Sequence, residues 1–172
     1  MTDPLVPAWA YEEISIEPYS ASWPVRAEAL ITSLRTLLPG PIEFVGSTSV
    51  PGLPAKPIVD LMASVESFDF VDQFADVVAP LGWHYVPPEL DGRDYRRFFV
   101  HVVDDHRNAH LHLMRPGADR WTEQLQFRDR LRSSASLRAE YAALKLELAE
   151  AHGSDREAYS AAKASFIEAA LR

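Results

Sequence analysis

The chain has 172 residues and a formal net charge of −8, with 47% hydrophobic and 24% charged residues. This length and composition predict one folded domain over residues 1–172 and exclude disorder as the main state. The absence of cysteine excludes disulfides, cysteine nucleophiles and thiolate metal sites. The acidic balance disfavours a nucleic-acid partner, because sequence-independent binding of duplex DNA needs many cations on phosphates.

No apolar stretch is long enough to span a membrane, and no basic and apolar leader is visible, so we expect a cytoplasmic protein without a membrane partner. The sequence indicates no obligate protein partner. The charge is uneven: residues 1–90 hold three basic and twelve acidic side chains, whereas residues 91–172 hold fourteen and thirteen. A small anionic ligand would therefore find its cationic partners mainly in the second half, with Lys56 as the exception.

The first half of the chain predicts three strands and one early helix. Residues 11–18 alternate in polarity and predict a short strand, and residues 22–38 place apolar side chains at helical spacing before a Pro-Gly-Pro stop. Strands are predicted over 42–46 and 57–65. The loop between them contains three prolines and is too rigid for a flexible linker.

The second half predicts a helix, a group of strands and then helices only. The helix covers 68–80, and strands are expected over 82–88, 93–103 and 109–114. The closing helices are expected over 118–133, 135–151 and 155–171, with Gly153 between the last two. This order predicts an α+β fold, in which a mixed or antiparallel sheet over about 11–114 is covered by a helical part over about 118–171.

The loop that follows the 42–46 strand is the first candidate for a binding site. Gly46 permits a tight turn, and Ser47, Thr48 and Ser49 offer hydroxyls and backbone N–H groups, which is the chemistry of a phosphate cradle. The Gly-Lys-Ser/Thr ending of a P-loop is missing. Lys56 lies within reach and favours an anionic ligand. The alternative interpretation is a hydroxyl-rich turn tightened by proline.

Three further residues form a candidate metal or catalytic set. Asp60 lies in a strand that is largely apolar on both faces, so its carboxylate needs partners or a metal ion. His110 and His112 share one face of a strand, about 7 Å apart along it. Two histidines and one carboxylate can ligate a divalent metal. The alternatives are a structural Asp–Arg pair and two histidines satisfied by hydrogen bonds.

The remaining candidates are cationic side chains that could bind an anion. Arg96 and Arg97 are neighbours on a strand, so one faces each side of the sheet. The helices add four more candidates, each at helical spacing from another polar or aromatic residue: Arg128, Arg132, Lys145 and Lys163. A solvated face of salt bridges is the alternative interpretation of these helical residues.

The residues from Glu43 to Asp60, which read EFVGSTSVPGLPAKPIVD, resemble the signature of the GrpB family, an uncharacterised protein family. Further matches extend the resemblance over about residues 11–171; they include RRFF at 96–99, HLHL at 110–113 and the Tyr159…Lys163 segment. The resemblance implies the nucleotidyltransferase superfamily, with a DNA-polymerase-β-like fold. A similar domain is found fused to dephospho-coenzyme A kinase in some bacteria.

In that superfamily a Gly-Ser loop holds nucleotide phosphates, and carboxylates hold divalent metals for phosphoryl transfer. The resemblance thus assigns Gly46 and Ser47 to phosphate and Asp60 to the metal, with Mg²⁺ or Mn²⁺ as the first expectation and a transition metal as the alternative. Met62 occupies the second acid position, and His110 and His112 stand where a third acid is expected. The predicted ligand is a nucleotide or related phosphate ester.

Three functions remain open from the sequence. The first is an enzyme that transfers a nucleotidyl group, with Lys56 and one of Arg96 and Arg97 neutralising charge. The second is a catalytically inactive ligand-binding domain, which the thioether of Met62 favours. The third is a metal centre made by Asp60 and the two histidines that performs hydrolysis or redox chemistry.

Overall fold

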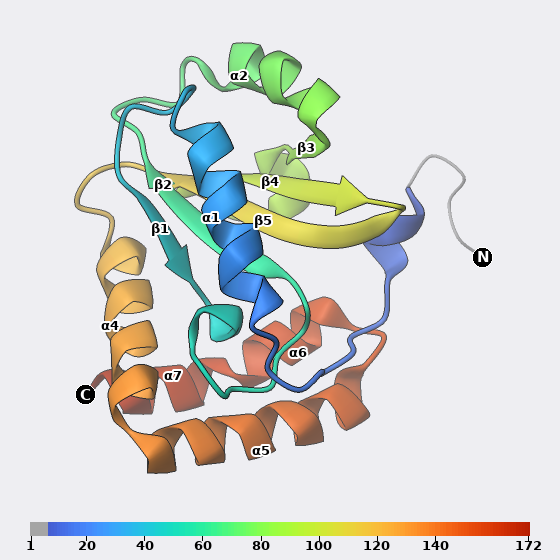
Figure 1. Ribbon diagram of the computed structural model, residues 1–172, viewed down its shortest axis with the longest axis vertical. Coiled ribbons are helices and arrows are strands. Elements are labelled where there is room, and N and C mark those ends of the chain that lie inside the picture. Colours follow the sequence, from blue (N-terminus) through green and yellow to red (C-terminus); the bar gives the residue numbers. More distant parts are fainter. Residues whose placement is uncertain (1–6) are drawn as a thin grey trace.

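The computed structural model describes residues 7–172 and contains one five-stranded sheet with helices on both of its faces (Figure 1). The strands are β1 (Ile42–Val45), β2 (Val59–Ser64), β3 (Trp83–Val86), β4 (Arg96–Val103) and β5 (His106–Met114). Their order in the sheet is β1-β2-β5-β4-β3. Only β2 and β5 run parallel, and the other three pairs are antiparallel. The predicted mixed sheet of an α+β fold is confirmed.

One face of the sheet carries the larger hydrophobic core. Helix α1 (Ser22–Leu34) buries Trp23, Ala27, Ile31 and Leu34. The spacing of these four side chains, three or four residues apart, makes one apolar stripe on the helix. Helix α2 (Val71–Val78) contributes to the same core, and β2, β4 and β5 add alternate residues from the sheet, such as Leu61, Phe99 and Leu111. Because strand side chains alternate, Asp60, His110 and His112 must point to the opposite face.

The opposite face meets the helical part of the chain. This part comprises α4 (Asp119–Ser133), α5 (Ala135–His152), α6 (Arg156–Ala162) and α7 (Ala164–Leu171). Its core includes Phe127, Leu131 and Tyr141, and the proline-rich loop inserts Val50 and Leu53 into it. The loop therefore joins the sheet to the helices. None of the helices within residues 7–172 combines the length and hydropathy needed to span a bilayer.

One short α-helix and three 3-10 helices complete the part of the chain that the structure describes: α3 (Pro88–Asp91), η1 (Ala8–Tyr11), η2 (Ser47–Ser49) and η3 (Ala79–Leu81). A break at Lys163 separates α6 from α7. On α4, Phe127 and Leu131 are buried, and Trp121 and Leu125 pack against a smaller cluster. The predicted helix over 155–171 is two helices in the structure.

Two local predictions were wrong. Residues 11–18 do not form a strand of the sheet: after η1 they make a single antiparallel bridge, between Glu17 and Ala55 of the proline-rich loop. Their alternating polarity instead lets Ile14 become buried while its neighbours stay exposed. The helix predicted over 22–38 ends at Leu34, and residues 35–37 follow it as a turn before Pro39.

Candidate functional site

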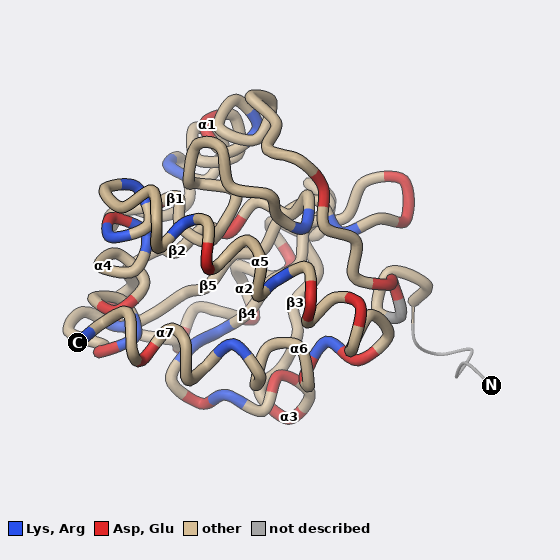
Figure 2. The backbone as a smooth tube through the Cα atoms, turned by 90° about the horizontal axis from the view of Figure 1, so that it is seen from below, with Lys and Arg blue, Asp and Glu red and all other residues tan. Residues whose placement is uncertain are grey.

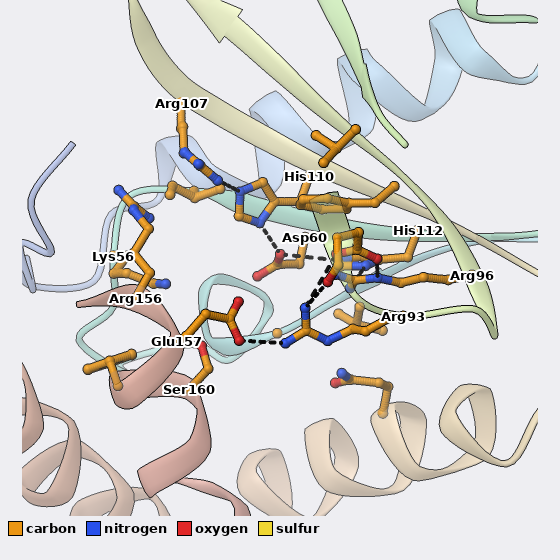
Figure 3. Close-up of a pocket in the computed structure, with 18 of the residues that line it drawn as sticks. Lys56, Asp60, Arg93, Arg96, Arg107, His110, His112, Arg156, Glu157 and Ser160 are labelled. Carbon is orange, nitrogen blue, oxygen red and sulfur yellow. Dashed lines mark hydrogen bonds and ion pairs between the residues drawn. The ribbon is translucent and has the colours of Figure 1, made fainter. Parts of the chain in front are cut away.

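Asp60, His110 and His112 come together on the sheet face that meets the helices. The parallel register places Asp60 beside His110 and Met62 beside His112. The Oδ1 atom of Asp60 lies 3.0 Å from Nδ1 of His110 and 3.6 Å from Nε2 of His112. One ligand-type atom from each residue lies within 4.8 Å of the others. Figure 3 shows the carboxylate between the two imidazoles.

Arginine side chains set the protonation of both imidazoles. Arg96 approaches Nδ1 of His112 at 2.5 Å, and Arg107 approaches Nε2 of His110 at 3.5 Å. Because a guanidinium can only donate hydrogen bonds, each far nitrogen acts as the acceptor. The nitrogen that faces Asp60 therefore carries the proton in each neutral ring. Asp60 is a carboxylate that faces two imidazole N–H groups.

Burial and hydrogen bonding shift the pKa values of all three residues downward. Burial lowers the pKa of His110 to about 4, although its bond to Asp60 acts in the opposite direction. Burial lowers the pKa of His112 in the same way. For Asp60, burial alone would raise the pKa, but the hydrogen bonds from the two histidines hold it well below its usual value. At neutral pH the set is thus one anion and two neutral rings.

The donor set fits a single divalent metal ion. Two imidazole nitrogens and one carboxylate oxygen suit Mn²⁺, Fe²⁺ or Zn²⁺ better than Mg²⁺, which prefers oxygen ligands. A metal would take the place of the two protons that now face Asp60. The far nitrogens meet arginines instead of the carboxylates or carbonyls that usually support metal-bound histidines. The cationic surroundings therefore weaken the binding of a free metal ion.

Within residues 7–172, the strand position two residues after Asp60 offers no ligand for a second metal. Met62 lies on the same face as Asp60, but it is fully buried and packs with Val45 and Met114. Helix α4 covers this cluster through Trp121 and Leu125. The position that would hold a second acid is thus part of the hydrophobic core.

Asp91 belongs to the site, and sequence reasoning missed it. This residue ends α3, and its carboxylate accepts two hydrogen bonds from Arg96, at 2.8 Å from Nε and 2.5 Å from Nη2. The Asp91 side chain is only 4% exposed. The pair fixes the guanidinium that contacts His112. The one available signal was an acid directly before Gly92, at a turn leading into the arginine pair.

A cavity of about 690 Å³ opens over the three residues and extends to the helices. Eight cationic side chains line it: Lys56, Arg93, Arg96, Arg107, Arg120, Lys145, Arg156 and Lys163. Three acids line it: Asp60, Asp91 and Glu157. The lining is therefore net positive in a protein whose net charge is −8. Seven of the eight cations come from the second half of the chain, as the charge distribution predicted.

The remaining charges are dispersed. Figure 2 shows basic positions interspersed with acidic ones along the backbone, without one continuous basic band. The cation excess is thus a property of the cavity, which favours a small anionic ligand over an extended polyanion.

The Gly46 loop lies at the edge of this cavity, next to Asp60. Gly46 has φ = 72°, and a Cβ atom there would stand 2.5 Å from Oδ2 of Asp60. Only glycine allows this approach. Thr48 and Ser49 donate their hydroxyls to the backbone carbonyls of Ile58 and Gly46. Of the three predicted hydroxyls, those of Thr48 and Ser49 are thus committed to holding the loop.

Four of the predicted binding residues lie outside the cavity lining. Arg97 points to the other face of the sheet, where it stacks on Phe68. Arg128 pairs with Glu43 and Asp129 in the position of a structural salt bridge. Arg132 donates to the carbonyl of Ser49, which is the fourth of these residues, and this contact fastens the proline-rich loop. Of the two neighbouring arginines, Arg96 is the one that faces the cavity.

The sheet, the Gly-Ser turn after β1 and the acid on β2 make a nucleotidyltransferase-like fold. The family model described as GrpB protein matches residues 13–172. The chain is 35% identical over 160 residues to the UPF0157 protein SCO7215 of Streptomyces coelicolor, covering 90% of this chain and 81% of that protein. The chain belongs to the GrpB family.

Solved structures agree with this assignment. The crystal structure of conserved protein GrpB from Enterococcus faecalis superposes with a TM-score of 0.81 at 28% identity, covering 91% of this chain and 94% of that one. Structures of the Cid1 poly(U) polymerase, bound to MgATP or MgGTP, superpose with a TM-score of 0.51 at 15% and 16% identity. They cover 78% of this chain and 44% of theirs, and they show a shared fold.

One relative is named for an enzyme activity. The dephospho-CoA kinase of Mycolicibacterium paratuberculosis is 26% identical over 185 residues. The match covers 92% of this chain but only 45% of that protein. The present chain thus spans less than half the length of this relative.

Proposed function

We propose that the cavity binds a nucleotide or a related phosphate ester together with one divalent metal ion. Asp60, His110 and His112 hold the metal, and Lys56 and Arg96 are among the cations that neutralise the phosphate charge. The observation that carries the proposal is the convergence of a two-histidine, one-carboxylate set with eight cations in one cavity. A bound metal ion would supply Lewis-acid polarisation of a phosphoryl oxygen.

The protein's own groups support this ligand class. Ser47 lies on the turn beside Asp60, and its backbone follows a glycine that allows close approach. Arg96 is oriented by its two bonds to Asp91, so it presents a fixed cation beside His112. The first ligands to try are ATP, GTP and dephospho-coenzyme A. ATP and GTP are bound in the Cid1 structures, and dephospho-coenzyme A is part of the name of the kinase relative.

Metal binding is tested with Co²⁺, because nitrogen ligation by histidine gives visible d–d absorption bands. We expect the bands in the metal-free protein titrated with Co²⁺, and their loss in Asp60→Asn and His112→Ala. Asp76→Asn, an exposed acid on α2, is the matched control and should retain them. Bands that persist in both site variants would refute the metal assignment.

Ligand binding is tested by thermal shift with ATP, GTP and dephospho-coenzyme A, each with Mn²⁺, Mg²⁺ or EDTA. A ligand that binds the folded state raises the melting temperature by mass action. The proposal expects a larger shift with Mn²⁺ than with EDTA, and loss of the metal-dependent part in Asp60→Asn. The absence of any shift with these ligands at millimolar concentration would count against the nucleotide.

Nucleotidyl transfer is the second candidate function, favoured by the Gly46-Ser47 turn next to Asp60. In this reaction an acceptor oxygen bonds to the α-phosphorus while pyrophosphate leaves with the bonding electron pair. The burial of Met62 removes the second metal-binding acid, which favours ligand binding without turnover. Release of pyrophosphate from ATP or GTP in the presence of Mn²⁺, abolished in Asp60→Asn, would establish the transferase. Binding without release would assign a binding domain.

A further inference from the structure

The lysines of this chain are confined to one place. Of the 17 cationic residues only three are lysine, namely Lys56, Lys145 and Lys163, and all three line the cavity. Arginine occupies every cationic position elsewhere in the sequence. The three lysines come from different elements: the proline-rich loop, α5 and the junction of α6 with α7.

The three ammonium groups gather around two tyrosine rings. Nζ of Lys163 lies 4.3 Å from the centre of the Tyr159 ring, and Nζ of Lys56 lies 5.2 Å from the same centre. Nζ of Lys145 lies 4.9 Å from the centre of the Tyr141 ring and donates a hydrogen bond to the carbonyl of Pro54. Both tyrosines are buried. The rings hold the ammonium groups by their faces and supply no negative charge.

No carboxylate within residues 7–172 lies within ion-pair distance of these three nitrogens. All twelve ion pairs described for that range involve arginine or histidine as the cation. Burial and mutual repulsion accordingly lower the pKa of Lys145 and of Lys163 to about 7. A cluster of like charges in which no amine has an ion-pair partner is costly, and a multiply charged anion removes that cost.

The form of the cluster indicates linked phosphoryl groups. An ammonium is a compact point charge with three donors, which suits phosphoryl oxygens approached from several directions, whereas an arginine fork suits one oxygen pair. When a bound anion keeps all three amines protonated, their combined charge exceeds that of a single phosphate monoester. We propose that Lys56, Lys145 and Lys163 form a subsite for a ligand with two or more linked phosphoryl groups, and that this subsite works without metal. This inference rests on the proposed function and narrows its ligand class to di- and triphosphates.

The test uses inorganic tripolyphosphate, pyrophosphate and orthophosphate, titrated calorimetrically into the protein in EDTA. The expected order of affinity is tripolyphosphate, then pyrophosphate, then orthophosphate. Lys145→Met and Lys163→Met should each weaken tripolyphosphate about tenfold or more, because each removes a charged hydrogen-bond partner. Arg35→Met removes an equal charge from an exposed position at the C-terminal cap of α1 and should bind as the parent protein does.

A second measurement needs no variant. The three lysines carry the only side-chain amines, so acetylation by an amine-reactive ester, followed by peptide mass spectrometry, reports on this subsite directly. Tripolyphosphate in EDTA should slow acetylation of all three lysines at least severalfold, and orthophosphate at the same concentration should not. Equal binding of orthophosphate and tripolyphosphate, or no protection of the lysines, would overturn the proposal.

The outcome separates this subsite from the metal site. Asp60→Asn should keep tripolyphosphate binding in EDTA, because no metal takes part there. If Co²⁺ binding fails while tripolyphosphate binds, the metal assignment is wrong and the lysine subsite stands. If Co²⁺ binds while tripolyphosphate does not, the lysine subsite is wrong and the metal assignment stands.

Discussion

Lys145→Met should make the free protein more stable although it weakens anion binding. Lys145 is 2% exposed, and burial together with Lys163 and Lys56 lowers its pKa to about 7, from an ordinary value of 10.5. A lowered pKa means that the folded state disfavours the charged amine. Methionine has a similar length and carries no charge. The ammonium group of Lys145 therefore places a positive charge in the cavity and lowers the free energy of unfolding.

The structure sets the size of the effect. One pKa unit corresponds to about 1.4 kcal/mol, so the shift of Lys145 amounts to a penalty of about 5 kcal/mol when the amine is charged in both states. Against this gain, the Pro54 carbonyl loses its hydrogen-bond donor, at a cost of about 1–3 kcal/mol. We expect Lys145→Met to raise the free energy of unfolding by about 2–4 kcal/mol at pH 6.

The pH dependence of stability tests whether the charge on Lys145 causes the effect. The folded pKa lies below the unfolded one, so the penalty is fully present below about pH 7 and disappears as pH rises toward 10.5. Stability of the parent protein should therefore rise over that range, and the advantage of Lys145→Met should shrink. Urea unfolding of both proteins at pH 6, 8 and 10 measures this, with Arg35→Met as the charge control. A destabilised Lys145→Met at pH 6, or an advantage independent of pH, would refute the reasoning.

Two further predictions concern the geometry of the site. Gly46→Ala should abolish Co²⁺ binding, because the new Cβ atom would displace the Asp60 carboxylate. Gly52→Ala is the control and should keep Co²⁺ binding, because Gly52 has a similar positive φ but no atom within 4 Å of the new Cβ position. Equal Co²⁺ spectra for the two variants would contradict this prediction. Arg96→Met should lower the free energy of unfolding by about 3 kcal/mol, because it removes the buried ion-pair partner of Asp91. Arg97→Met should lower it by less than about 1 kcal/mol, because the Arg97 side chain is partly exposed. Equal shifts of the urea midpoint in the two variants would show that the pair with Asp91 is not decisive.

The candidate metal set was predictable in composition but not in geometry. Alternation along a strand predicts that His110 and His112 share a face, and it separates Asp60 from Leu61. The contact itself depends on the parallel pairing of β2 with β5, which joins segments 50 residues apart. Strand order is a property of the packed sheet, so residue spacing carries no information about it.

The differences between the expected and the observed positions of these charged residues have a common physical origin. Arg97, Arg128 and Arg132 carry the same charge as the cavity cations, and their separation depends on which face each element turns toward the core. Asp91 was missed for the converse reason, because its role comes entirely from the arginine it contacts. Charge is visible in a sequence, whereas the partner of a charge is visible only after folding.

Taken together, the two proposals imply that the metal and the polyphosphate bind cooperatively. A free divalent metal approaching Asp60 meets the cations Arg96 and Arg107 behind the histidines, and these repel it. A polyphosphate in the lysine subsite would reverse that local charge and add oxygen ligands for the metal. Each should therefore increase the affinity for the other by the same factor, as linkage requires. Metal affinity measured with and without tripolyphosphate, and tripolyphosphate affinity measured with and without Mn²⁺, must then agree after correction for the complex that the two form in solution.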